Sequence, residues 1–291
     1  MKILKNKGLF ILMSLAMISW GIAWTNAKIL RNYLNYDNLV FLRFLFGFLS
    51  LMPFIYKKIN YISKIPIKTL ANILAMGCLF YIYNYYFFKG TDLGQSGFGG
   101  VFVTTTNPII TFIIMTVISK KIQLNQMFGI ILGIFGGLLI MDIFNMGILH
   151  LFDIQNKYFL ICTIIWGIMT VLMTYGQKKI ESSLYISLCY LATTIISLFF
   201  IDSNQLVQIF NFDYIFYVNF ILVSIGAMSF GTSVYIYASS RLGAIQVSAF
   251  IFTVPFIALF TAYAVLNEPI SLNVIIGGII SIIATLAVNK R

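Results

Sequence analysis

Long apolar runs recur along the whole chain, separated by short segments that hold most of the charged residues. Each run has about 20 residues, the length that a helix needs to cross roughly 30 Å of hydrocarbon. Runs such as FGIILGIFGGLLIM do not alternate between apolar and polar residues, as the strands of a membrane barrel would. The pattern predicts an all-α integral membrane protein with ten transmembrane helices, at residues 8–27, 36–56, 68–88, 97–118, 124–142, 157–176, 183–201, 214–238, 243–264 and 271–288.

The composition excludes a soluble fold. Of the 291 residues, 60% are hydrophobic and 9% are charged, whereas an average soluble domain has about 25% charged residues. The net charge of +11 by itself would suggest a nucleic-acid partner. However, fourteen of the 19 cations fall on one side of the predicted membrane and four on the other, while Arg43 lies inside a span. The positive-inside rule assigns the basic side, with both termini, to the cytoplasm. The basicity therefore indicates topology, and we expect no nucleic-acid partner.

The remaining composition is consistent with an AT-rich bacterium and gives no sign of an enzymatic centre. Ile, Phe, Asn, Lys and Tyr are abundant, and their codons are AT-rich. The three cysteines lie in separate predicted spans without CxxC spacing, so no disulfide, metal site or cofactor is expected. HExxH, P-loop and nucleotide-binding patterns are missing from the sequence. We expect a protein that is not an enzyme and is not driven by ATP.

The chain contains a duplicated pattern. ISWGIAW corresponds to IIWGIMT 146 residues later, TTTNPIITF to IFTVPFIAL 147 residues later, and LNQMFGIILG to LNVIIGGIIS 148 residues later. Each half would hold five spans, and because five is odd, the second half must enter the membrane from the opposite side. The order of these matches predicts two inverted five-helix repeats, at residues 1–150 and 151–291.

Each repeat carries a proline in its fourth span, Pro108 and Pro255. A proline within a helix leaves the carbonyl four residues earlier without its usual N–H partner, here Thr104 and Ile251. Interrupted helices at matching positions of two repeats mark the binding site in many transporters. The alternative is a pair of simple kinks packed by neighbouring helices.

These features together resemble the drug/metabolite transporter superfamily, EamA-type. The resemblance covers the whole chain and rests on Trp-Gly in the first span of each half, the paired prolines, and NEPISLNVIIGGIISIIATLAV at the end. Glu268 matches the family's glutamate between the fourth and fifth spans, whereas the first half has Lys121 there. Arg43 matches an arginine often found in the second span. The resemblance implies a ten-helix permease of the cytoplasmic membrane that moves small organic solutes and often exports amino acids or related metabolites.

Polar residues at helical spacing predict a central cavity. A buried amide without a partner costs about 2–7 kcal/mol, so Asn84, Asn107 and Gln246 each need a partner or a wet cavity. Aromatic side chains would supply the apolar walls. The residues predicted to line the cavity are Trp20, Tyr81, Asn84, Tyr85, Thr104, Asn107, Trp166, Tyr235, Gln246 and Phe250. The alternative for the small and aromatic residues is helix packing.

Two charged residues have two interpretations each. Arg43, about 10 Å deep in the second span, either clamps neighbouring helices or faces the substrate. Glu268, at a membrane boundary, either couples protons or complements the dipole of a helix start. The sequence as a whole favours a secondary transporter of small, neutral or zwitterionic solutes, with amino acids as the first candidates. A passive channel and a non-transporting scaffold are the alternatives.

Overall fold

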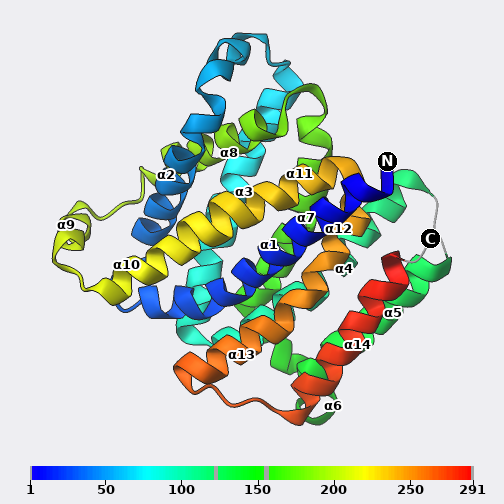
Figure 1. Ribbon diagram of the computed structural model, residues 1–291. Helices are drawn as coiled ribbons and strands as arrows, with labels where there is room; N and C mark the ends of the chain where they lie inside the picture. The colour runs from blue at the N-terminus through cyan, green and yellow to red at the C-terminus, as the bar shows by residue number, and fades with distance from the viewer. Residues whose placement is uncertain (1, 121–123, 154–156, 290–291) are drawn as a thin grey trace.

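The computed structural model describes residues 2–120, 124–153 and 157–289, and these residues form helices with no strand among them (Figure 1). The main helices of the first half are α1 (Lys2–Leu30), α2 (Tyr36–Ile55), α3 (Ile67–Leu93), α4 (Ser96–Ser119) and α5 (Leu124–Ile140). Those of the second half are α7 (Lys157–Gly176), α8 (Ser182–Ser197), α10 (Tyr214–Ile221) with η5 (Leu222–Thr232) and α11 (Ser233–Leu242), α12 (Ala244–Phe250) with η6 (Ile251–Thr253) and α13 (Val254–Leu266), and α14 (Leu272–Asn289).

Short helical turns fill the connections. They are η1 (Tyr56–Lys64), α6 (Ile143–Met146), η2 (Ile148–Phe152), η3 (Gln177–Lys179), α9 (Ser203–Val207) and η4 (Gln208–Asn211). Within the described ranges, six helical segments are long and apolar enough to cross a membrane: Gly8–Leu30, Tyr36–Lys64, Ser96–Ser119, Lys157–Lys179, Tyr214–Leu242 and Ala244–Leu266. Three shorter apolar helices accompany them, Gln126–Ile140, Ser182–Ser197 and Leu272–Ala284. Each of the ten predicted spans overlaps a helix, and the count of ten crossings stays a prediction.

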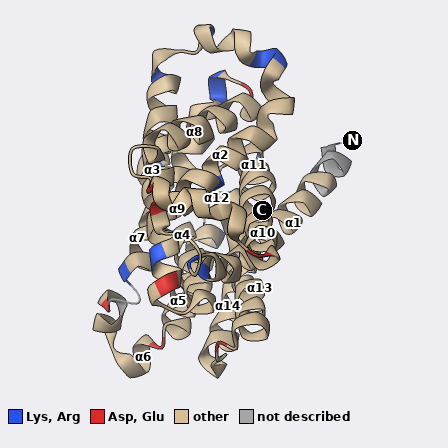
Figure 2. Cartoon of the chain, turned by 90° about the vertical axis from the view of Figure 1, so that its left-hand side faces the viewer, with Lys and Arg blue, Asp and Glu red and all other residues tan. Residues whose placement is uncertain are grey.

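The outer surface of the helices is apolar. Large side chains such as Phe54, Val117 and Phe260 are between 66% and 71% exposed. Lys, Arg, Asp and Glu lie mainly at helix ends and in the connections, with few along the helices (Figure 2). A water-soluble protein rarely exposes so much contiguous apolar surface, whereas the hydrocarbon of a bilayer favours it.

The two halves are interlocked. Helix α1 packs against α13 and η5, α4 packs against α7 and α13, and α8 packs against α2 and α3. At one edge of the molecule, α5 lies alongside α14 (Figure 1). Gly136 and Gly277 allow this pair to approach closely, because a Cβ on Gly277 would lie 2.6 Å from the Gly136 carbonyl oxygen. The core therefore consists of helices from both halves, which is what a site shared between repeats requires.

The prolines occupy different helical settings. Pro108 lies inside a continuous α4, so the predicted interruption of the fourth span is wrong. Hydroxyl groups of the preceding turn bond to carbonyls one turn back, as in the 2.9 Å bond from Thr105 Oγ1 to Val101 O. The ninth span is interrupted: α12 ends, η6 follows as a 3-10 turn, and Pro255 lies in the first turn of α13, where a proline costs no hydrogen bond.

The eighth span contains a π-helix that the sequence did not predict. The π-helical segment η5 has 11 residues, and its wider turns use bonds between residues five apart. Thr232 Oγ1 donates to Ala227 O over 3.2 Å in this register. Two side chains from other helices also bond to carbonyls here: Trp20 Nε1 donates to Ala227 O at 3.0 Å and Tyr190 Oη donates to Met228 O at 2.8 Å. These partners stabilise an otherwise rare conformation beside the centre of the molecule.

A candidate substrate cavity at the centre of the helix bundle

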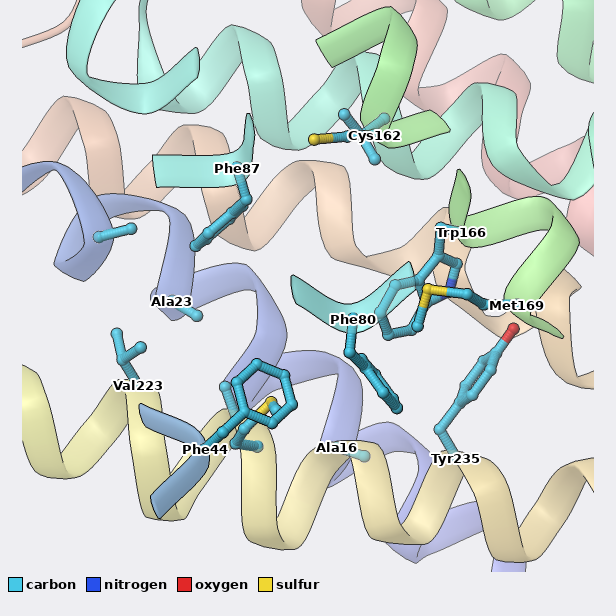
Figure 3. Packing of buried hydrophobic residues seen from close by; sticks show 14 of the residues in the cluster. Ala16, Ala23, Phe44, Phe80, Phe87, Cys162, Trp166, Met169, Val223 and Tyr235 are labelled. Carbon is cyan, nitrogen blue, oxygen red and sulfur yellow. The ribbon is translucent and has the colours of Figure 1, made fainter. Parts of the chain in front are cut away.

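A cavity of about 40 Å³ lies where α1, α2, α3, α4, α7, η5 and η6 meet. Five of the ten residues predicted for the cavity line it, namely Trp20, Asn84, Thr104, Asn107 and Trp166, and Arg43 lines it as well. The rest of its wall is formed by Ala23, Trp24, Tyr83, Phe87, Met228, Thr232 and Ile251. Figure 3 shows the packed core around two of these residues, Phe87 of α3 and Trp166 of α7, with Phe80 of α3 and Tyr235 of α11 beside Trp166.

Aromatic rings form one side of the cavity. Trp20 and Trp166 occupy corresponding positions in the two halves, and their rings meet edge to face with centroids 5.0 Å apart. The Tyr83 ring lies 4.8 Å from that of Trp166. Edge-to-face and tilted contacts of this kind suit the charge distribution of aromatic rings. The tryptophans of the two Trp-Gly motifs thus contact each other where the two halves meet.

Arg43 forms the charged side of the cavity. The residue is 6% exposed, and its Nη1 donates to Asn84 Oδ1 at 2.7 Å. Asn84 is held in turn by a 2.8 Å bond from its Nδ2 to Phe80 O. The guanidinium carbon lies 5.3 Å from the Phe87 ring centroid. Within the part of the chain that the structure describes, Arg43 Nε has no hydrogen-bond partner.

Asn107 and Thr104 extend the polar wall along α4. Both are buried, at 2% and 4% exposed. The Thr104 hydroxyl donates to Gly100 O, one turn back along the helix. Among the described residues, Asn107 Oδ1 has no donor facing it. Both residues thus line the cavity, and Arg43 and Asn107 each have one buried polar atom without a hydrogen-bond partner among the described residues.

Glu268 lies away from this cavity and caps a helix of the other half. Its Oε1 accepts bonds from Ser96 N at 2.9 Å, Ser96 Oγ at 3.1 Å and Lys28 Nζ at 3.0 Å, and its Oε2 accepts from Gly97 N at 2.8 Å. These N–H groups are the unpaired donors at the start of α4, where the helix dipole also favours a negative charge. Burial raises the pKa of the carboxyl, but the hydrogen bonds from Gly97, Ser96 and Lys28 outweigh it and hold the pKa below its usual value.

A sequence model of the EamA-like transporter family matches the chain twice, at residues 7–142 and again at 155–290. The chain belongs to the EamA-like transporter family. It is therefore a multi-pass membrane transporter of the drug/metabolite type, with a small-molecule substrate. None of the curated proteins matches the sequence. One solved crystal structure superposes on this EamA-like transporter with a TM-score of 0.67 at 12% identity, covering 97% of this chain and 96% of the other. That similarity is one of fold.

Five of the ten residues predicted for the cavity of this EamA-like transporter do not line it: two lie on α3, two on α12 and one, Tyr235, on α11. Tyr81 Oη donates to Asp37 Oδ1 at 2.6 Å, and the Tyr85 ring contacts Tyr36, so both point away from the centre. The face of α3 that reaches the cavity is rotated from the predicted one and presents Asn84 with its neighbours.

Two further residues predicted for the cavity, Gln246 and Phe250, lie on α12. The Phe250 ring packs against Phe10, with centroids 5.2 Å apart, and Gln246 is half-buried outside the cavity. Tyr235 is fully buried behind the wall, with its ring 4.9 Å from Trp20 and its hydroxyl 3.0 Å from that of Thr170.

Several cavity residues were not predicted from the sequence. Trp24 follows Trp20 by four residues, and Tyr83 and Phe87 have the same spacing beside Asn84, so helical periodicity could have found them. Met228 and Thr232 gave no usable signal, because they reach the cavity from a π-helix whose register differs from that of an α-helix.

Proposed function

We propose that this protein is a secondary transporter that carries small organic solutes, above all amino acids or related neutral or zwitterionic compounds, through the central cavity. The two repeats, residues 1–150 and 151–291, would be inverted five-helix units, with ten crossings and both termini in the cytoplasm of a bacterium. Export is the proposed direction. The observation that carries the proposal is the meeting of Trp20 and Trp166 beside Arg43 and Asn107, deep within an apolar bundle.

The size of the cavity supports a moving transporter. About 40 Å³ is room for roughly two or three water molecules and is too small for an amino acid. A solute would therefore need the helices around the cavity to separate, first on one side of the membrane and then on the other. Rocking of two repeats about a site near the midplane provides such alternating access. A passive channel would need a continuous polar lining, and the aromatic wall does not supply one.

Two connections between the halves suit this mechanism, one near each end of the helices. In one, Glu268 joins α4 to α1 and to the segment after α13. In the other, Tyr185 Oη of α8 donates to Asn72 Oδ1 of α3 at 2.6 Å. Both contacts are made in the present conformation, and in the proposal they would break when the repeats rock. In the proposal, Glu268 is a structural acceptor, and any proton coupling would use another group.

The test is solute counterflow in proteoliposomes with a panel of amino acids, nucleobases, sugars and amines. Asn107→Ala should lower the exchange of the transported solute at least ten-fold, because it removes a polar group from the cavity wall. The matched control is Asn219→Ala, which changes another buried asparagine that bonds within its own helix and does not line the cavity. Counterflow by none of the solutes, or equal exchange by both variants, would refute transport through this cavity.

A further inference from the structure

The charge of Arg43 lacks a counter-ion within the protein. Each of the eight acids of the sequence lies in the described ranges, and each has a partner other than Arg43. These partners are Tyr81 for Asp37, Arg31 and Tyr36 for Asp92, Asn145 and Asn273 for Asp142, His150 for Asp153, Lys58 and Ser183 for Glu181, the Asn204 N–H for Asp202, Tyr33 for Asp213 and Lys28 for Glu268. Arg43 therefore carries a buried positive charge that is neutralised by no carboxylate of the described chain.

A buried guanidinium in this position is unusual. Arginine cannot release its proton in a protein, so the charge stays. Charged side chains are almost never fully buried unless they are paired, because desolvation of an unpaired ion is costly. The neutral oxygen of Asn84 and the face of Phe87 compensate for part of that cost. They leave Nε free and the net charge unbalanced.

We infer that the transported solute carries a carboxylate that pairs with Arg43. This inference rests on the proposed function and specifies its substrate class. A planar carboxylate matches the donor geometry of a guanidinium and supplies the missing charge. An amino group on the same solute would meet the free oxygen of Asn107 and the faces of the tryptophans. The site would thus accept carboxylates with or without an amine, and would reject amines, amides and other solutes that lack the anionic group.

The first arm of the test compares matched ligands on the purified protein. Two series serve as probes: leucine, leucinamide, 3-methylbutylamine and 4-methylpentanoate, and phenylalanine, phenylalaninamide, phenethylamine and 3-phenylpropanoate. Binding is followed by thermal stabilisation and by calorimetric titration. We expect the carboxylates to bind roughly a hundred-fold more tightly than the amide and amine of the same series. The amide and the amine have no carboxylate, so they cannot form the buried charge pair with Arg43. Equal or tighter binding of an amide or amine would overturn the inference.

Variants then connect the preference to Arg43. Arg43→Gln should remove the preference for carboxylates, whereas Arg43→Lys should keep part of it because the charge remains. The matched control is Arg241→Gln, which removes an exposed cation that lies over Tyr237. If Arg43→Gln keeps the full preference, the inference is wrong. Sodium chloride and sodium phosphate are titrated as inorganic probes. Stabilisation by either that equals the effect of the carboxylates and depends on Arg43 would assign the counter-ion to an inorganic anion and overturn the inference.

The second arm needs no ligand. Asn84→Asp has the same shape and places a carboxylate 2.7 Å from Nη1 of Arg43, so it supplies the missing charge from within. We expect the ligand-free variant to melt roughly 2–4 °C higher than the wild type and to lose binding of carboxylates. Asn84→Ser, which adds no charge, should not melt higher. A lower melting temperature for Asn84→Asp than for Asn84→Ser would overturn the inference even if neither ligand series binds. Counterflow of a solute that has no carboxylate would overturn the inference that the solute must carry one, while the proposed transport function would remain.

Discussion

The cap that Glu268 places on α4 allows a quantitative prediction. The change is Glu268→Gln, which keeps the shape of the side chain and removes its charge. Glutamine has one acceptor oxygen, so it can serve either Ser96 or Gly97, and its amide NH₂ must face the other donor. Ser96 is fully buried and Gly97 is also buried, so water does not readily replace the lost acceptor.

The magnitude follows from these contacts. One buried N–H without a partner costs about 1–3 kcal/mol. Replacement of charged by neutral hydrogen bonds and loss of the favourable helix dipole add about 1 kcal/mol. We therefore expect the free energy of unfolding to fall by about 2–4 kcal/mol. At about 2 °C per kcal/mol for a chain of this size, the melting temperature should fall by about 4–8 °C.

The assay is thermal unfolding of the purified protein in detergent, followed by tryptophan fluorescence. The control is Glu181→Gln, which removes the same type of lysine–glutamate pair at a side chain that is 60% exposed. Exposed pairs contribute about 0–1 kcal/mol, so this variant should melt within about 2 °C of the wild type. Equal shifts in the two variants would show that the buried donors of α4 do not depend on Glu268, and would refute the reasoning.

Three further predictions concern packing, the cavity and pH. Gly100→Ala should lower the melting temperature by several degrees in a thermal-unfolding assay, since its Cβ would lie 2.5 Å from a side chain of α13, whereas Gly226→Ala has open space around it and should not. Gln246→Ala should leave counterflow within about two-fold of the wild type, in contrast to Asn107→Ala, because Gln246 lies outside the cavity. The folded-state pKa of Glu268 is lowered, so its stabilisation is present above the usual carboxyl pKa of 4.5 and is lost as the pH falls through the folded-state value. The difference in melting temperature between wild type and Glu268→Gln should therefore be constant near pH 7 and shrink at acidic pH.

These three predictions have distinct contradictory outcomes. A melting temperature for Gly226→Ala as low as that for Gly100→Ala would mean that loss of glycine itself, and not the contact with α13, is responsible. A large loss of counterflow in Gln246→Ala would place the transport path along α12. A difference between wild type and Glu268→Gln that persists unchanged into acid would mean that the charge of Glu268 is not what the helix start requires.

The sequence by itself determined the helical class and the duplicated organisation. Apolar runs of membrane-spanning length can form only helices or barrels in hydrocarbon, and their lack of alternation excluded the barrel. The paired Trp-Gly motifs then pointed to two related halves, and the family match finds the same duplication. Five of the ten residues predicted for the cavity line it, and so does Arg43, because polar side chains in a membrane helix usually face the interior of the bundle.

Only the tertiary structure decided which face of each helix turns inward. Two residues correspond to about 200° of rotation about a helix, so Tyr83 and Phe87 lie on nearly the opposite face of α3 from Tyr81 and Tyr85, and in an apolar helix both faces look similar in sequence. The lipid-facing side of a membrane helix is as apolar as its packed side, so periodicity carries little information about orientation.

The backbone irregularities were also decided by distant contacts. The sequence placed a proline in each half symmetrically, yet α4 continues through Pro108 while the ninth span breaks before Pro255. Two carbonyl groups of the π-helix accept hydrogen bonds from Trp20 and Tyr190, which belong to other helices. The role of Glu268 likewise required knowing that the start of α4 lies within 3 Å of it, across 171 residues of sequence. The local sequence limits the helix types that a segment can form. Hydrogen-bond donors and acceptors on other helices then determine which of these types the segment adopts.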